Sequence, residues 1–162
     1  MKRFPAILAF CGVAALPPSV LAATSSASFN VQITITSACS LSASDLVFPT
    51  TGLLASDVAG STSLGVTCTN TTPYSIGIDK GVNGASVTSR EMIGGPSSEL
   101  VSYQLCQDSA CATNWGNTIG SDTVSGTGTG AAQSVTVYGL VPAQTTPAPG
   151  VYTDTVQVQL TY

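Results

Sequence analysis

The sequence predicts an all-β protein, an immunoglobulin-like β-sandwich, and two observations carry this prediction. Short runs in which apolar and polar residues alternate recur along the chain, and turn residues separate them. Beyond residue 22, no stretch has the spacing of an amphipathic helix. About seven such runs in a chain of 162 residues fit a single sandwich domain.

The N-terminus has the features of a signal peptide. Two basic residues precede an apolar run, Phe4–Leu16, and small residues follow around Ala22 and Ala23, between which we expect cleavage. Two prolines, Pro17 and Pro18, interrupt the run before it reaches the ~20 residues needed to span a bilayer. We therefore expect an exported mature chain that has no membrane span.

The first run of the mature chain, Ser28–Thr36, is the most informative segment. Its apolar side chains Phe29, Val31, Ile33 and Ile35 share one face of a predicted strand. Because no turn residue follows to fold the run back onto the chain, it could add itself to the sheet edge of another molecule. An ordinary first strand of a sandwich explains the same pattern, and the residues alone leave both interpretations open.

The later predicted strands lie between turn signals such as Pro73 and Asn83-Gly84. Ser125–Gly130 and Pro142–Gly150 have the composition of exposed loops. The last run is the clearest, and the chain ends within it, so we expect an uncovered sheet edge there. The predicted strands contain Asp45–Phe48; Leu64, Val66 and Cys68; Tyr74, Ile76 and Ile78; Val101, Tyr103 and Leu105; Val135 and Val137; and Tyr152, Val156, Val158, Leu160 and Tyr162.

Four cysteines remain after the predicted cleavage, and an even number in an exported chain predicts two disulfides. We favour Cys39–Cys68 together with Cys106–Cys111, because the second pair brackets a short connection that can close as a hairpin. A zinc site is disfavoured, because the chain has no histidine and the C-x4-C spacing is unusual for zinc.

Charge and composition argue against several functions. The mature chain keeps eight acidic residues against Lys80 and Arg90, a net charge of −6, which disfavours nucleic acid as a partner. Because the chain has no histidine, it offers few side chains suited to catalysis, and we expect neither an enzyme nor a cofactor. Asp122 and Asp154 begin Asp-Thr-Val triplets, but the glycine of an aspartic-protease loop is absent from both. Trp115 could stack on a sugar, although a core or rim position is favoured.

Several short motifs follow one another in a characteristic order: Ser37-Ala38-Cys39, Leu64-Gly65-Val66-Thr67-Cys68, Arg90-Glu91-Met92, Tyr103-Gln104-Leu105, Trp115-Gly116, Val137-Tyr138-Gly139 and Gly150-Val151-Tyr152-Thr153-Asp154-Thr155-Val156. This order resembles the spore coat protein U domain family, which includes subunits of archaic chaperone–usher pili. The resemblance covers essentially the whole mature chain. Its most specific part is the closing motif and the strand that follows it to Tyr162.

The resemblance implies an incomplete immunoglobulin-like pilin domain in residues 37–162, an N-terminal donor strand segment in residues 23–36 and a signal peptide in residues 1–22. In such pilins a periplasmic chaperone lends the missing strand. An outer-membrane usher then exchanges it for the donor strand of another subunit. The family's donor residues correspond to Phe29, Val31, Ile33 and Ile35.

The resemblance also places Cys39 and Cys68 at the cysteines that staple the early strands of such pilins, whereas Cys106 and Cys111 depart from the family pattern. It implies passage through the periplasm to the cell surface and a role in adhesion and biofilm formation. The alternatives are a secreted monomeric sandwich that binds a ligand as a lectin does, and a spore or outer coat protein. A hydrolase is a weaker rival.

Overall fold

The computed structural model describes residues 21–162, and most of the predicted signal peptide lies outside the described residues. The chain divides into two units, residues 1–34 and residues 35–162. Described residues before Cys39 form no strand. The second unit contains nine strands and no helix, which confirms the all-β prediction: β1 (Cys39–Ala43), β2 (Val58–Cys68), β3 (Pro73–Ile78), β4 (Arg90–Gly94), β5 (Glu99–Cys106), β6 (Val124–Thr127), β7 (Ala132–Val141), β8 (Tyr152–Thr153) and β9 (Val158–Thr161).

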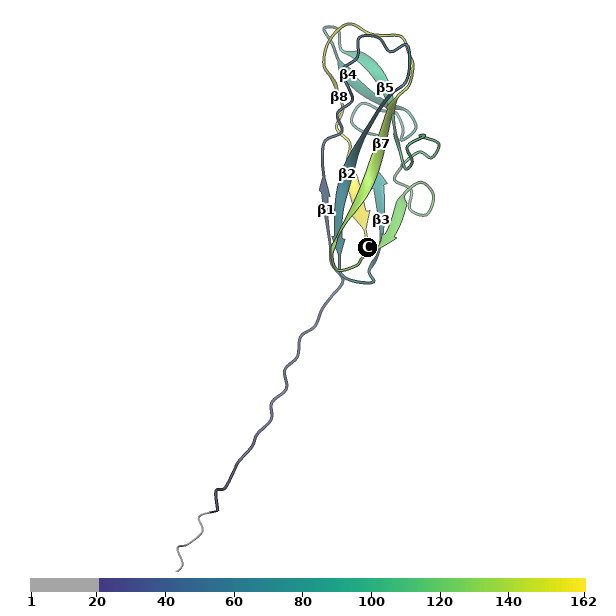
Figure 1. The fold of residues 1–162 in the computed structure, drawn as a ribbon. Helices are drawn as coiled ribbons and strands as arrows, with labels where there is room; N and C mark the ends of the chain where they lie inside the picture. The colour runs from purple at the N-terminus through teal and green to yellow at the C-terminus, as the bar shows by residue number, and fades with distance from the viewer. Residues whose placement is uncertain (1–20) are drawn as a thin grey trace, which may run out of the picture. The chain divides into compact units, whose positions relative to one another are not determined.

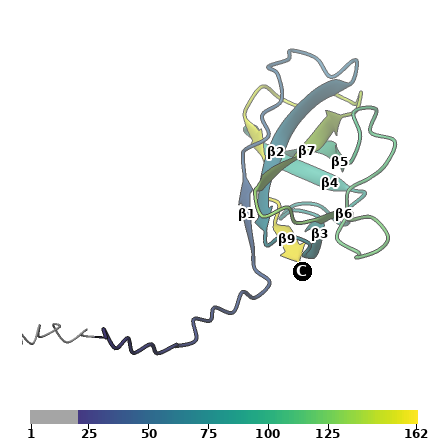
Figure 2. The same ribbon diagram turned by 60° about the horizontal axis from the view of Figure 1, so that its bottom comes forward.

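The nine strands form two antiparallel sheets (Figures 1 and 2). The larger sheet has the order β1-β2-β7-β5-β4-β8, and the smaller has the order β6-β3-β9. Alternate residues of the long strands point inward, so Leu64 and Val66 of β2 meet Ile76 and Ile78 of β3 in one core. Trp115 completes this core with no exposed surface, and its indole N–H donates to the carbonyl of Ile76 at 2.8 Å.

The final strand prediction needs correction. The sequence predicts one continuous run from Tyr152 to Tyr162, but the structure divides it into β8 on the larger sheet and β9 on the smaller. The chain crosses between the sheets at residues 154–157, where the Asp154 carboxylate accepts hydrogen bonds from the N–H of Val82 at 3.0 Å and from the Tyr103 hydroxyl at 2.7 Å. Alternation persists through such a crossover, so periodicity alone does not reveal it.

The predicted strand Asp45–Phe48 is also wrong, because these residues form no ladder. Leu46 and Phe48 pack instead over Gly60 and Gly139, where a Cβ on Gly139 would lie 2.8 Å from a methyl group of Leu46. The two glycines thus provide the space into which the segment inserts its side chains.

Both disulfides have the pairing that we expected. Cys39 and Cys68 lie directly opposite each other on β1 and β2, so this bridge fixes the start of β1 to the end of β2. Cys106 and Cys111 close a short loop after β5. In this loop the exposed Asp108 carboxylate accepts three backbone N–H groups, which lower its pKa.

Arg90 has no exposed surface and sits where several loops meet the core. Its guanidinium donates to the carbonyls of Ile78 at 3.0 Å, Asp79 at 2.8 Å, Val87 at 2.7 Å and Trp115 at 2.7 Å. Burial lowers the pKa of the guanidinium, and nearby carboxylates oppose that shift. The sequence alone indicates no role for Arg90, yet its planar guanidinium joins the end of β3 to the segment around Trp115.

We expect Arg90→Met to lower the free energy of unfolding by about 3 kcal/mol or more, because each buried carbonyl left without a donor costs about 1–3 kcal/mol. Arg90→Lys should recover only part of this loss, since an ammonium offers three donors in place of five. Urea denaturation of both variants tests this. A lysine variant as stable as the parent would contradict the role of the guanidinium.

Candidate functional site

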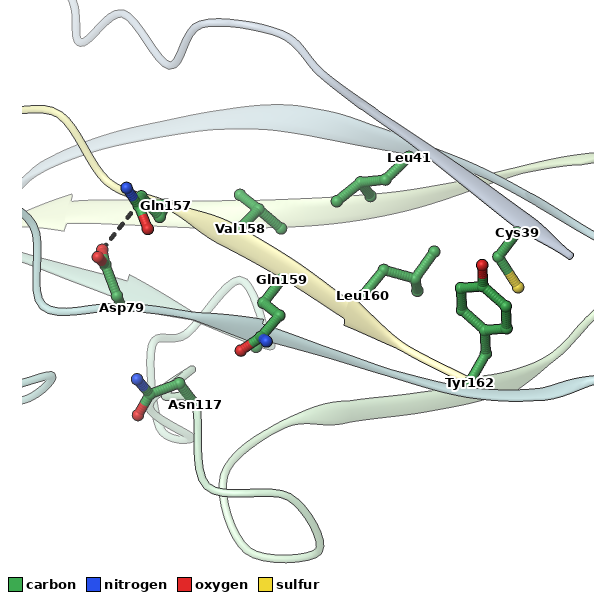
Figure 3. A pocket seen from close by; sticks show the side chains of 10 residues that line it. Cys39, Leu41, Asp79, Asn117, Gln157, Val158, Gln159, Leu160 and Tyr162 are labelled. Atoms are coloured by element: carbon green, nitrogen blue, oxygen red, sulfur yellow. Dashed lines mark hydrogen bonds between the residues drawn. The ribbon is translucent and has the colours of Figure 1, made fainter.

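Two sheet edges that lie beside each other have no strand partner within residues 21–162. β1 pairs only with β2, and β9 pairs only with β3, so each strand presents one free row of backbone N–H and C=O groups. β1 and β9 approach each other at the opening between the sheets (Figures 2 and 3). They form no ladder with each other. The sandwich is therefore open along this side.

The opening leads into an apolar groove. A cavity of about 560 Å³ lies between the extended segment Ser44–Phe48 and the chain around β8 and β9. Core residues form its floor, among them Leu64, Ile78 and Leu105. A second hollow of about 630 Å³ continues along β9 toward the C-terminal end and is shown in Figure 3.

The walls of the groove are apolar side chains that the domain only half covers. In Figure 3, Leu41 of β1 and Val158 and Leu160 of β9 face the space between the strands, whereas Gln159 points to the other side. All three apolar side chains pack against the core but remain half-buried. By contrast, Ile76 on the neighbouring β3 is fully buried. One layer of cover is missing above β1 and β9.

Another edge of the same domain is covered. β5 extends beyond the end of β7, and there the side-chain amide of Gln144 takes the place of a strand. Its oxygen accepts the N–H of Ser102 at 3.1 Å, and its nitrogen donates to the carbonyl of Ser102 at 2.9 Å. Natural sheets commonly protect their edges in this way. The edges of β1 and β9 have no such cover and border the groove, which makes them a candidate interaction surface.

The predicted donor side chains lie on the N-terminal segment and are largely exposed. Phe29, Val31, Ile33 and Ile35 are 87%, 85%, 83% and 75% exposed. Their segment forms no strand. Four large apolar side chains exposed at alternate positions are unfavourable in water, so the segment has the features of a strand without its partner.

The alternating sequence predicts the β9 wall of the groove but not the opposite wall. Val158 and Leu160 belong to the run predicted as an open edge. Leu41, Leu46 and Phe48 complete the lining, and only the last two fell within a predicted strand. The alternation of Cys39 and Leu41 with exposed serines was the available signal for β1.

The floor of the groove includes a tyrosine whose hydroxyl is already hydrogen-bonded within the domain. This residue, Tyr103, donates its hydroxyl to Asp154, and burial together with this hydrogen bond raises the pKa of Tyr103 well above its usual value. Within residues 21–162, no three potential ligand side chains gather in a way that could hold a metal ion. The same part of the chain contains no helix that could cross a membrane.

Tyr103 gives a prediction for alkaline pH. Because its folded-state pKa is raised, its contribution to stability is complete below about pH 10 and is lost as the pH rises further. Tyr103→Phe should be less stable by about 1–3 kcal/mol at pH 8, where Asp154 loses a donor. The difference between the two proteins should narrow by pH 11. Urea denaturation at both pH values measures it, and a constant difference would contradict the prediction.

Comparisons with known proteins place this domain in a family. The model of the family described as Spore Coat Protein U domain matches residues 25–159. "Protein U" of Myxococcus xanthus is 31% identical, over 97% of this chain and 95% of its own length.

The fold is also that of a solved pilus protein. The domain is similar, with a TM-score of 0.58 and 25% identity, to a chain in the crystal structure of the CsuC-CsuE chaperone–tip adhesion subunit pre-assembly complex from archaic chaperone-usher Csu pili of Acinetobacter baumannii. The similarity covers 80% of this chain and 40% of the length of that one. The all-β sandwich is thus the immunoglobulin-like fold of chaperone–usher pilus subunits.

Proposed function

The chain belongs to the Spore Coat Protein U domain family, and we propose that it is a structural subunit of an extracellular pilus, assembled by donor-strand exchange. The single observation that carries this proposal is the open groove between β1 and β9. The same chain carries, in residues 23–36, an exposed segment with the alternation that such a groove requires. A groove and a strand that complement each other between copies generate a linear polymer.

Four properties of the donor segment describe how it would occupy the groove. Ser28–Thr36 would span about 30 Å as a strand, at roughly 3.3 Å per residue. Its Phe29, Val31, Ile33 and Ile35 side chains would point toward the half-covered Leu41, Val158 and Leu160. The segment carries no charged residue, which suits burial in an apolar site. Its backbone would meanwhile pair with the free edges of β1 and β9.

The energy of such a junction accounts for a stable fibre. Burying four apolar side chains contributes about 1.5–3 kcal/mol each, or roughly 6–12 kcal/mol before the cost of ordering the segment. Backbone hydrogen bonds along two edges add to this. We therefore expect very slow dissociation, since differences in affinity appear mainly in the off-rate.

An open groove also requires protection before assembly. We propose that a periplasmic chaperone lends a strand to β1 and β9, and that an outer-membrane usher exchanges it for the donor segment of another subunit. The similarity to a subunit from a chaperone pre-assembly complex supports the first partner. Residues 1–22 would direct export as a signal peptide cleaved between Ala22 and Ala23. The fibre would serve adhesion and biofilm formation at the cell surface.

A coat protein is the second candidate, and the 31% identity to Protein U supports it. Strand exchange would serve a coat and a pilus equally, because both are built from repeated copies. Electron microscopy of the cell surface separates them: free fibres indicate a pilus, and a continuous layer indicates a coat.

Substitutions at two adjacent residues test whether the segment acts as a donor strand. Ile33→Asp would place an unpaired carboxylate in the apolar groove, at a cost of several kcal/mol, whereas Thr34→Asp lies on the opposite face. Only Ile33→Asp should abolish the ladder of polymers on unheated gels. Capture of Ile33→Asp by the chaperone should persist, since this side chain lies outside the folded core. Equal polymerisation of both variants would refute the donor assignment.

Mixing two blocked subunits sharpens the test. Leu160→Asp should disable the groove while its donor segment remains intact, and Ile33→Asp should do the reverse. Neither protein should polymerise alone, but together they should form a dimer that grows no further. Gln159→Asp, on the outward face of β9, is the matched control for Leu160→Asp. Longer polymers in the mixture would contradict a single donor and a single groove per chain.

The need for a chaperone gives a further prediction. Expressed alone in a periplasm, the protein should polymerise or be degraded, because its groove is uncovered. Co-expression with the cognate chaperone should yield a soluble one-to-one complex on size-exclusion chromatography with light scattering. A stable monomer that resists assembly would favour the secreted monomeric alternative.

A further inference from the structure

Each chain carries a donor segment only two residues away from its own groove, since Ser37 and Ala38 alone separate Thr36 from β1. Insertion of a chain's own segment would end polymer growth, because the closed monomer could neither donate nor accept a strand. We propose that Thr69 is a positioning residue that holds the base of the donor segment and so prevents the chain from filling its own groove. This inference rests on the proposed function and adds a residue that controls it.

Thr69 extends the pairing of β1 with β2 by one further step. Its N–H donates to the carbonyl of Ala38 at 2.9 Å, and its hydroxyl oxygen accepts the N–H of Ala38 at 3.1 Å. The hydroxyl lies 3.2 Å from the carbonyl oxygen of Ala38 and 3.4 Å from that of Thr36, to either of which it can donate. The Cys39–Cys68 disulfide anchors the adjacent pair. The residues before β1 are thereby tied to the end of β2.

The side-chain alternation excludes the tightest reversal of the chain. A two-residue loop at Ser37-Ala38 would pair Thr36 with Cys39 and Thr34 with Leu41. Directly opposed residues share a face of the sheet, and Cys39 and Leu41 face the core. This register would turn the threonines into the groove and leave Ile33 and the other apolar donors in solvent.

A three-residue loop would restore the correct face, but this chain resists it. With Thr36, Ser37 and Ala38 in the loop, Ile35 would pair with Cys39 and Ile33 with Leu41. Such loops place a residue in the left-handed region, a position that favours glycine or asparagine, and the loop contains neither. Ala38 would also have to leave Thr69, which would break the hydrogen bonds that join them. Insertion of all four donor side chains into the chain's own groove would therefore require Ala38 to be released from Thr69.

The test measures insertion of the donor segment into the groove of its own chain. Unlike exchange between chains, this insertion does not depend on protein concentration. Full-length mature protein is refolded without chaperone over a range of concentrations, and hydrogen exchange then reports protection of residues 28–36. The unaltered chain should show protection only where polymers form. Ala38→Gly combined with Thr69→Val should give a monomer whose segment is protected at every dilution. Loss of the hydroxyl contacts should raise the closed fraction about tenfold over Ala38→Gly alone.

Matched variants separate positioning from stability. Thr69→Ser keeps the hydroxyl, so combined with Ala38→Gly it should behave as Ala38→Gly alone. Thr67→Val makes the same chemical change at an exposed position on β2 that pairs with Ser40 rather than with Ala38, and it should leave the closed fraction unchanged. Ile33→Asp added to the double variant should abolish protection. A closed fraction equal in the valine and serine variants would overturn the role of Thr69.

A separate arm distinguishes failure of this inference from failure of the proposed function. A synthetic peptide of residues 24–36 is added to the full-length Ile33→Asp chain, whose own segment is disabled. If the peptide does not bind, the groove is not a donor-strand site and the proposed function fails, and this inference with it. If the peptide binds but the Ala38→Gly, Thr69→Val chain stays open, only the inference about Thr69 fails.

Discussion

The uncovered strip of core between β1 and β9 is the constraint from which the other properties of this domain follow. A β-sandwich buries its core only when both sheets reach far enough to cover it, and here the two sheets end with free edges side by side. Val158 and Leu160 are inward-facing residues, yet they remain half exposed. One added strand would both pair with the free backbone groups and cover the half-exposed side chains.

Several structural devices keep this opening in a defined shape. The Cys39–Cys68 bridge holds β1, an edge strand that pairs only with β2, against that neighbour. On the other wall, Asp154 anchors the crossover that leads into β9. Arg90 joins the end of β3, the sole partner of β9, to the loop that carries Trp115. These interactions preorganise the groove, so that an incoming strand bears less of the cost of ordering it.

The opening also ties folding to assembly. An uncovered apolar edge promotes aggregation, and a protein that keeps one needs a partner from the moment it folds. The alternating N-terminal segment is exposed in the same chain, and in the proposed assembly it would cover the open edge of another copy. For this to produce a fibre, the segment has to reach another copy before its own groove. The contacts of Thr69 with Ala38 and Thr36 favour that outcome.

The sequence by itself determined the fold class and the alternation of the N-terminal segment, and it favoured the disulfide pairing that the structure has, because strand alternation and cysteine spacing are local signals. Phe29, Val31, Ile33 and Ile35 could be selected for this reason. Only the tertiary structure decided that the last run splits between two sheets, and that Leu41, Leu46 and Phe48 form the wall opposite β9. It likewise buried Arg90 among carbonyls from four separate positions. Such features depend on which distant segments meet, and the period of a strand is the same whether its neighbour is present or missing.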